Sequence, residues 1–239
     1  MTRARGQTIK MAIKNGDFIE IEYTGSIKDD GSVFDTTDKK TAEENGIFSQ
    51  KTQYGPIVVV LGESHLIKGL DKELDGKEIG KEYEISLPPE KAFGKRDAKL
   101  LQLIPAKRFS KESIRPMPGM QVNVDGMLGI VRNVSGGRTI VDFNHPLASK
   151  EVTYAVKLKR IVDDVIEKIS ALLIIKLSLR KDMVTVGFAE GKATITLPVK
   201  LPDEFAKLET EEIKRLVPEA KEVCFLEKKP EKMKDKDVK

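Results

Sequence analysis

A small set of aromatic and acidic side chains near the ends of predicted strands could form a binding site. Tyr23, Phe34 and Asp35 lie close together in the sequence, Phe93 follows a proline-rich segment, and Tyr154 lies in an alternating stretch. The chain has two histidines, one cysteine and no tryptophan, which leaves little for His-based triads or metal clusters. Taken alone, Tyr23, Phe93 and Tyr154 are better explained as core aromatics. Asp35 would pass for a turn residue, but its place after Phe34 favours a role in a pocket.

Several segments have the residue pattern of strands. Residues 18–23, 81–87 and 152–158 alternate apolar and polar side chains, which predicts half-buried strands. Residues 56–61 form a continuous apolar run that ends at Gly62, as expected of a strand covered on both faces. Together these segments predict an antiparallel sheet.

One short helix is predicted between these strands. Ser64 is a suitable N-cap, apolar residues follow at helical spacing up to Leu74, and Gly76 stands where a helix would stop. The sequence therefore predicts an α+β fold in which an antiparallel sheet wraps around one short helix.

The composition changes after Phe93-Gly94. Residues 96–118 contain Pro105, Pro116 and Pro118 and are predicted to be irregular. Short strands are then predicted at 120–124, 129–134 and 139–143, with glycine-containing turns between them. We interpret this stretch as a small β domain inserted before the last strand of the first domain.

A further unit begins at Asp163-Asp164, which open a helix. A hairpin around Glu190-Gly191, a second helix from Pro202-Asp203 and a strand at 223–226 complete the order α-β-β-α-β. The predicted domains are residues 11–95 plus 142–162, the insert 96–141, the C-terminal domain 163–226, and a disordered charged tail 227–239.

Several local motifs occur in the order and spacing of one known family. They are Tyr23-Thr24-Gly25, Phe34-Asp35-Thr36-Thr37, Leu61-Gly62-Glu63, Leu66-Ile67-Lys68-Gly69-Leu70 and Leu87-Pro88-Pro89-Glu90. Over about residues 13–162 the chain resembles the FKBP prolyl isomerases. The segment Asn144-His145-Pro146-Leu147 resembles the one that closes the insert in the flap of SlyD-like members. With its C-terminal unit, the chain is similar to the long archaeal FKBPs.

The resemblance implies a proline pocket and assigns its residues. The positions that match the catalytic pocket are Tyr23, Phe34, Asp35, Ile67, Phe93 and Tyr154, and the matching substrate contacts are Leu61, Leu66, Leu70 and Leu147. Leu66 and Ile67 match the segment whose backbone N–H meets the substrate carbonyl. Leu70 stands where many members have a tryptophan that floors the pocket. A shallower pocket would bind macrolide ligands at most weakly.

The implied chemistry needs no nucleophile, metal or cofactor. Rotation about an X-Pro bond breaks amide resonance across a barrier of ~18–20 kcal/mol, but no bond is made or cleaved. A dry aromatic cavity favours the twisted amide, because that form has lost charge separation. We therefore expect an isomerase without cofactors or a metal site.

Composition narrows the range of partners. Lys+Arg 42 against Asp+Glu 38 is not the basic excess of a dedicated nucleic-acid binder. Apolar runs such as residues 171–175 are too short to span a membrane. Unfolded or nascent polypeptides with X-Pro bonds are the expected partners, in the cytoplasm. Apolar helix faces in the C-terminal unit (Ile166, Ile169, Leu173; Phe205, Leu208) favour a homodimer.

Two functions of different classes remain open from the sequence. One is a prolyl isomerase whose insert captures unfolded chains, and the candidates for exposed apolar contacts on the insert are Ile104, Met117, Met120, Met127 and Leu128. The other is a holdase chaperone in which the insert and C-terminal unit bind clients and the pocket is weak or vestigial. The presence of both Asp35 and Phe93 favours the isomerase. A ribosome- or RNA-associated factor is a third alternative, supported only by the lysine-rich tail.

Overall fold

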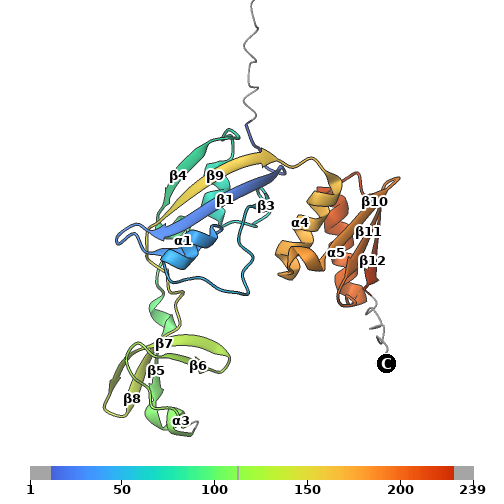
Figure 1. Cartoon of the computed structure of the whole chain (residues 1–239). Helices are drawn as coiled ribbons and strands as arrows, with labels where there is room; N and C mark the ends of the chain where they lie inside the picture. The colour runs from blue at the N-terminus through green and yellow to red at the C-terminus, as the bar shows by residue number, and fades with distance from the viewer. Residues whose placement is uncertain (1–11, 112, 229–239) are drawn as a thin grey trace, which may run out of the picture. The chain divides into compact units, whose positions relative to one another are not determined.

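Alternating apolar residues build the central strand of a five-stranded sheet (Figure 1). In this computed structural model, which describes residues 12–111 and 113–228, strand β1 (Phe18–Ile27) buries Ile19 and Ile21 on one face. The sheet has the order β2-β1-β9-β4, and β3 also pairs with β1. Its other strands are β2 (Val33–Thr36), β3 (Ile57–Val60), β4 (Glu82–Leu87) and β9 (Val152–Ile161). Strands β3 and β2 pair antiparallel with successive halves of β1.

By contacts, the chain separates into two units. The core unit comprises residues 12–26, 32–85 and 154–228 of the described chain, and the insert unit comprises residues 27–31 and 86–153. Each unit has a hydrophobic cluster of its own. The α+β class predicted from the sequence is confirmed.

The short helix of the core unit is α2 (Lys68–Leu74), which buries Leu70 and Leu74. The prediction that Ser64 caps it is wrong, because Ile67 occupies the N-cap position and Ser64 has a left-handed backbone conformation (φ 61°). The buried carboxylate of Asp71 lies near the N–H groups of Gly62 and Ser64, in the turn that precedes the helix.

A second helix, α1 (Lys39–Glu44), was not predicted. It is capped by Asp38, whose carboxylate accepts the N–H of Thr41 at 2.7 Å, and it buries only Ala42. A six-residue helix with a single buried residue has no apolar periodicity for a sequence pattern to detect.

The C-terminal part of the core unit has the predicted order of elements. It contains α4 (Val165–Leu177), η3 (Lys181–Met183), β10 (Thr185–Ala189), β11 (Lys192–Leu197), α5 (Asp203–Leu216) and β12 (Glu222–Glu227). Asp164 caps α4 through the N–H of Glu167. Strand β11 pairs antiparallel with β10 and parallel with β12, and α5 supplies the crossover that a parallel pair requires.

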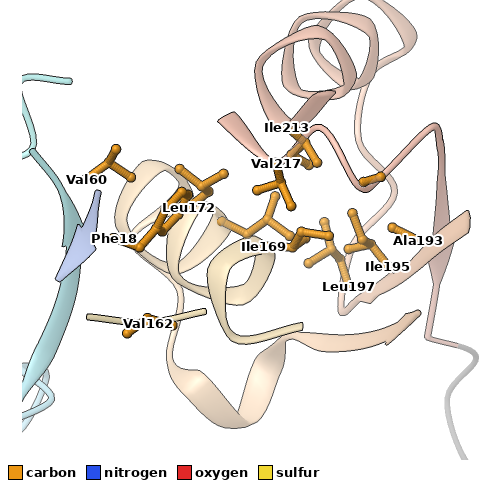
Figure 2. Close-up of a cluster of buried hydrophobic side chains, with 12 residues drawn as sticks. Phe18, Val60, Val162, Ile169, Leu172, Ala193, Ile195, Leu197, Ile213 and Val217 are labelled. Carbon is orange, nitrogen blue, oxygen red and sulfur yellow. The ribbon is translucent and has the colours of Figure 1, made fainter. Parts of the chain in front are cut away.

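Helix α4 packs against the five-stranded sheet as well as against the strands of the C-terminal part (Figure 2). Phe18 and Val60 belong to the same buried cluster as Ile169, Leu172 and Leu173. Two residues that were expected to form a dimer face, Ile169 and Leu173, are therefore buried within the chain. The other residues expected there are exposed: Ile166, Phe205 and Leu208.

The insert unit contains a four-stranded antiparallel sheet of order β5-β8-β7-β6. Its elements are η1 (Pro89–Lys91), η2 (Ala98–Leu100), β5 (Leu101–Pro105), α3 (Ala106–Lys111), β6 (Gln121–Val124), β7 (Met127–Ser135) and β8 (Arg138–Asp142). The segment predicted to be irregular thus includes a strand and a helix. The core is small and centres on Phe109, Val131 and Val141.

The N-terminal residues 1–11 and most of the tail predicted to be disordered lie outside the described residues. In the described part, no helix is both long and apolar enough to cross a membrane.

Candidate active site

Strands β1 and β2 bring the hydroxyl of a tyrosine within hydrogen-bond distance of a carboxylate. Tyr23 donates a hydrogen bond of 2.8 Å to Oδ2 of Asp35. Asp35 pairs with Gly25, so Tyr23, two residues before Gly25, is its diagonal neighbour on the same face of the sheet. Asp35 is exposed and Tyr23 is half-buried, so this pair lies at the surface of the sheet.

Tyr154 of β9 joins this pair to a second aromatic ring. Its ring centroid lies 6.0 Å from that of Tyr23 and 5.8 Å from that of Phe34, with Phe34 in an edge-to-face arrangement. Gly25 makes this closeness possible, because a Cβ atom there would lie 2.7 Å from the Phe34 ring and 2.9 Å from the Tyr154 ring. The structure therefore brings Tyr23, Phe34, Asp35 and Tyr154 together.

Burial raises the pKa of both tyrosine hydroxyls in this group. Burial is the largest cause that raises the pKa of Tyr23, followed by the charge of Asp35 and their hydrogen bond. Burial and the Asp35 charge also raise the pKa of Tyr154 well above its ordinary value. Both hydroxyls are thus neutral hydrogen-bond donors near neutral pH.

The predicted carbonyl-binding residues lie on the turn between β3 and α2. Leu66 and Ile67 are half-buried, and the Ile67 carbonyl accepts the N–H groups of Leu70 and Asp71. Leu61 and Leu70 are fully buried, so they pack beneath the turn and do not offer a surface to a substrate. His65 also holds the turn, since its Nδ1 accepts the N–H of Val60 at 3.1 Å.

Phe93 and Leu147, the remaining predicted site residues, lie in the insert unit. The Phe93 ring stacks on His145 with centroids 4.7 Å apart and an interplanar angle of 4°. Nδ1 of His145 accepts the N–H of Leu147 at 3.1 Å, which fixes the imidazole in that orientation. Nothing local in the sequence connects His145 to Phe93, so this contact is not predictable from the residue pattern.

Backbone hydrogen bonds join the two ends of the inserted segment. Ser149 donates its N–H to the Gly94 carbonyl at 2.8 Å, and Phe143 donates to Leu100 at 2.9 Å. Asn144 accepts the N–H of Asp97 at 2.8 Å and returns a hydrogen bond to its carbonyl. The two ends of the inserted segment are thus held together by hydrogen bonds within the insert unit.

The insert exposes more apolar side chains than the sequence predicted. Of the predicted residues, Met117 (59 % exposed), Met127 and Leu128 (62 %) are exposed, Met120 is half-buried, and Ile104 is buried at 5 %. Ile104 was misassigned because β5 turns it toward the small core, where it packs with Phe109 and Val141. Leu101 and Leu103, which the sequence reasoning missed, are exposed on the same strand.

A pocket of the core unit shares only Tyr23 with this aromatic group. It has a volume of about 520 Å³, and Tyr23 borders it whereas Phe34, Asp35 and Tyr154 do not. Its wall includes Lys157, which is ion-paired with Glu82 at 2.7 Å. A charged, ion-paired wall does not suit an apolar X-Pro segment, so the aromatic group remains the candidate. Among the described residues, no group of His, Cys, Asp and Glu is placed to hold a metal ion.

Comparison with known proteins decides the family. Residues 10–112 match the model of the FKBP-type peptidyl-prolyl cis-trans isomerase family, and residues 102–147 match that of the FKBP26 IF domain. A short-type peptidyl-prolyl cis-trans isomerase of Methanocaldococcus jannaschii is 35 % identical over 62 % of this chain and 92 % of its own length. The chain belongs to the FKBP family.

More distant FKBP relatives are also similar. The FKBP-type isomerase SlyD of Vibrio cholerae is 31 % identical over 49 % of this chain and 60 % of its own length. The FKBP-type 16 kDa isomerase of Escherichia coli is 31 % identical over 44 % of this chain and 74 % of its own length. This FKBP is therefore a SlyD-like peptidyl-prolyl cis-trans isomerase, which settles the question between isomerase and holdase in favour of the enzyme.

Proposed function

We propose that this FKBP isomerises X-Pro bonds of unfolded or nascent proteins at the group formed by Tyr23, Phe34, Asp35 and Tyr154. Ile67 and Leu66 of the core unit complete the proposed pocket, and Leu61 and Leu70 support it. Phe93 and Leu147 of the insert unit are assigned to the reaction by the family resemblance alone. The observation that carries the proposal is the hydrogen bond from Tyr23 to Asp35 beside the packed rings of Phe34 and Tyr154. It combines an apolar wall with a fixed polar group at the surface of the sheet.

The proposed mechanism is preferential binding of the twisted amide. Apolar rings remove water from the X-Pro bond, which destabilises the charge-separated planar amide relative to the twisted form. The Ile67 N–H would bind the carbonyl that precedes the proline, and Asp35 would hold the Tyr23 hydroxyl in place. To speed a step of 10–100 s to some hundreds per second requires roughly 5 kcal/mol. Aromatic packing and a few oriented hydrogen bonds are sufficient for that amount.

Removal of either member of the Tyr23–Asp35 pair tests the pocket. Tyr23→Phe and Asp35→Ala should each lower kcat/KM for short X-Pro peptides by about tenfold, since each breaks an oriented hydrogen bond near the reacting amide. Tyr83→Phe is the matched control, because the Tyr83 hydroxyl bonds the backbone of Glu78 elsewhere on the same unit. Wild-type rates in both test variants, with normal melting curves, would contradict the assignment.

We further propose that the insert unit captures unfolded clients. Its support is the set of exposed apolar residues of the insert: Leu101, Leu103, Met117, Met127 and Leu128. Methionine and leucine side chains adapt to varied apolar partners because they repack easily. A client held there would raise the effective concentration of its prolines near the pocket to the millimolar range.

We also propose that the chain is divided at the predicted boundaries into an isomerase domain, an insert domain and a C-terminal domain. Homodimerisation is supported by exposed Phe205 and Leu208 on α5. A cytoplasmic location agrees with the single free cysteine, Cys224. Weak binding of macrolides follows from Leu70 in place of a tryptophan.

A further inference from the structure

An arginine in the C-terminal part of the core unit forms an ion pair with a residue of the turn that precedes Ile67. Arg215 lies in the last turn of α5. Its two terminal nitrogens, Nη1 and Nη2, each donate a hydrogen bond of 2.7 Å to one carboxylate oxygen of Glu63. Glu63 lies in the turn between β3 and α2. This bidentate geometry fixes the orientation of the Glu63 carboxylate as well as its distance from the guanidinium group. A lysine at the same position could not fix the orientation.

Two further polar side chains lie at the same turn. The carboxylate of Asp71 lies near the backbone N–H groups of Gly62 and Ser64, which have left-handed φ values of 87° and 61°. Nδ1 of His65 accepts the N–H of Val60 at 3.1 Å. The turn is thus held by a side chain of its own, His65, and by Arg215 of α5.

Arg215 is itself carried by a part of the chain that is firmly attached. Ile213 and Val217, on either side of it, belong to the buried cluster that contains Phe18 and Val60 (Figure 2). Arg160 of β9 adds a second ionic link, to Glu20 of β1 and Glu167 of α4. The position of Arg215 relative to the turn is therefore set by packing.

We propose that Arg215 is a positioning residue for the isomerase reaction, which through Glu63 holds the 61–66 turn and so presents Leu66 and Ile67 to the substrate. The inference rests on the proposed assignment of Leu66 and Ile67 to substrate binding. It makes α5 part of the catalytic apparatus. A backbone donor aids a transition state only while it is held in place, since small displacements of an oriented group sharply reduce rates.

Substitutions at the Arg215–Glu63 pair test this role in the full chain. Arg215→Gln and Glu63→Gln should each lower kcat for a short X-Pro peptide by roughly three- to tenfold, with KM changed less than about twofold, because the turn loses its outer support. Arg215→Lys should lie between wild type and Arg215→Gln. The double variant E63R/R215E restores the ion pair with reversed charges and should recover most of the lost kcat.

Arg160→Gln is the matched control, since it removes an arginine link between the same two parts of the core unit without touching the turn. Hydrogen exchange at residues 62–67 supplies a second readout. It should quicken in Arg215→Gln and stay unchanged in Arg160→Gln. Unchanged kcat and exchange in Arg215→Gln would overturn the proposal, as would equal losses of kcat in both arginine variants.

The proposed pocket is tested separately by Tyr23→Phe. A loss of rate in Tyr23→Phe together with wild-type kcat in Arg215→Gln would support the proposed pocket and contradict the positioning role of Arg215. Wild-type rates in Tyr23→Phe, together with a slow Arg215→Gln, would place the reaction near the 61–67 turn but away from Tyr23.

Discussion

In the core unit, Tyr23 and Asp35 are joined by a hydrogen bond of 2.8 Å beside packed aromatic rings, whereas in the insert unit Met127 and Leu128 project into solvent from the start of β7. The first arrangement sets the orientation of each group. The second leaves flexible apolar side chains free to adapt. The difference matches the two tasks proposed for the chain, because catalysis depends on fixed geometry and capture of varied clients does not.

The largest expected effect comes from overfilling the aromatic group. In Gly25→Ala the new methyl group would lie within 3 Å of the Phe34 and Tyr154 rings, so these rings must move. We expect peptide isomerisation to fall by about thirtyfold or more and stability to fall by about 1–3 kcal/mol. Protease-coupled assays and urea unfolding measure the two quantities.

Gly187→Ala provides the control for that substitution. A Cβ at Gly187 in β10 meets only the Thr194 carbonyl oxygen at 3.9 Å, so it fits without strain. Equal activities of Gly25→Ala and Gly187→Ala would mean that the packing of Phe34 and Tyr154 does not matter for turnover.

Polar substitutions on the insert should produce a smaller and more selective effect. Leu103→Ser with Leu128→Ser removes two exposed apolar side chains without altering the core around Phe109. We expect the catalysed rate of a proline-limited refolding reaction to fall about fivefold, because each lost contact weakens client binding. Turnover of a tetrapeptide should not change.

Val199→Ser is the comparison for that pair, because Val199 is equally exposed but lies in the C-terminal part of the core unit. A similar loss of refolding activity in Val199→Ser would show that exposed apolar surface in general, rather than the insert, binds clients.

The smallest expected effect concerns pH. Burial lowers the pKa of His65, and its Nδ1 accepts the Val60 N–H, so the neutral imidazole is the folded form. A depressed folded-state pKa means that stability is complete above the ordinary value of ~6.5 and is lost as pH falls from there through the lowered folded value. Between pH 7 and pH 5 we expect the melting temperature to fall by about 2 °C more in the wild type than in His65→Gln. Equal falls in both proteins would exclude His65 as the cause.

Sequence periodicity predicted the parts of the fold that rest on local patterns. Ile19 and Ile21 alternate on β1, and Asp164 caps α4 as the sequence indicated. The same reasoning missed β5, where adjacent apolar residues face both the core and the solvent. Ile104 is buried and Leu103 is exposed, and no alternation separates them in the sequence.

The candidate site was predictable in its residue types but not in its contacts. Family motifs identified Tyr23, Asp35 and Tyr154, and the structure brings these side chains together. The stacking of Phe93 on His145 joins residues far apart in the sequence, where no periodic signal reaches. The link from Arg215 to Glu63 spans still more of the chain and depends on how α5 packs.

The most direct test of the central claim compares two substrates in one variant. Residues 101–142 are replaced by a short Gly-containing loop, which retains the hydrogen bonds between Asp97 and Asn144 at the base of the insert. Tetrapeptide turnover should stay within about threefold of the wild type, while catalysis of a proline-limited refolding reaction should fall about tenfold or more, because only a protein client gains from tethering. Equal losses on both substrates, or undiminished catalysis of refolding, would contradict the separation of a fixed catalytic pocket from an adaptable capture surface.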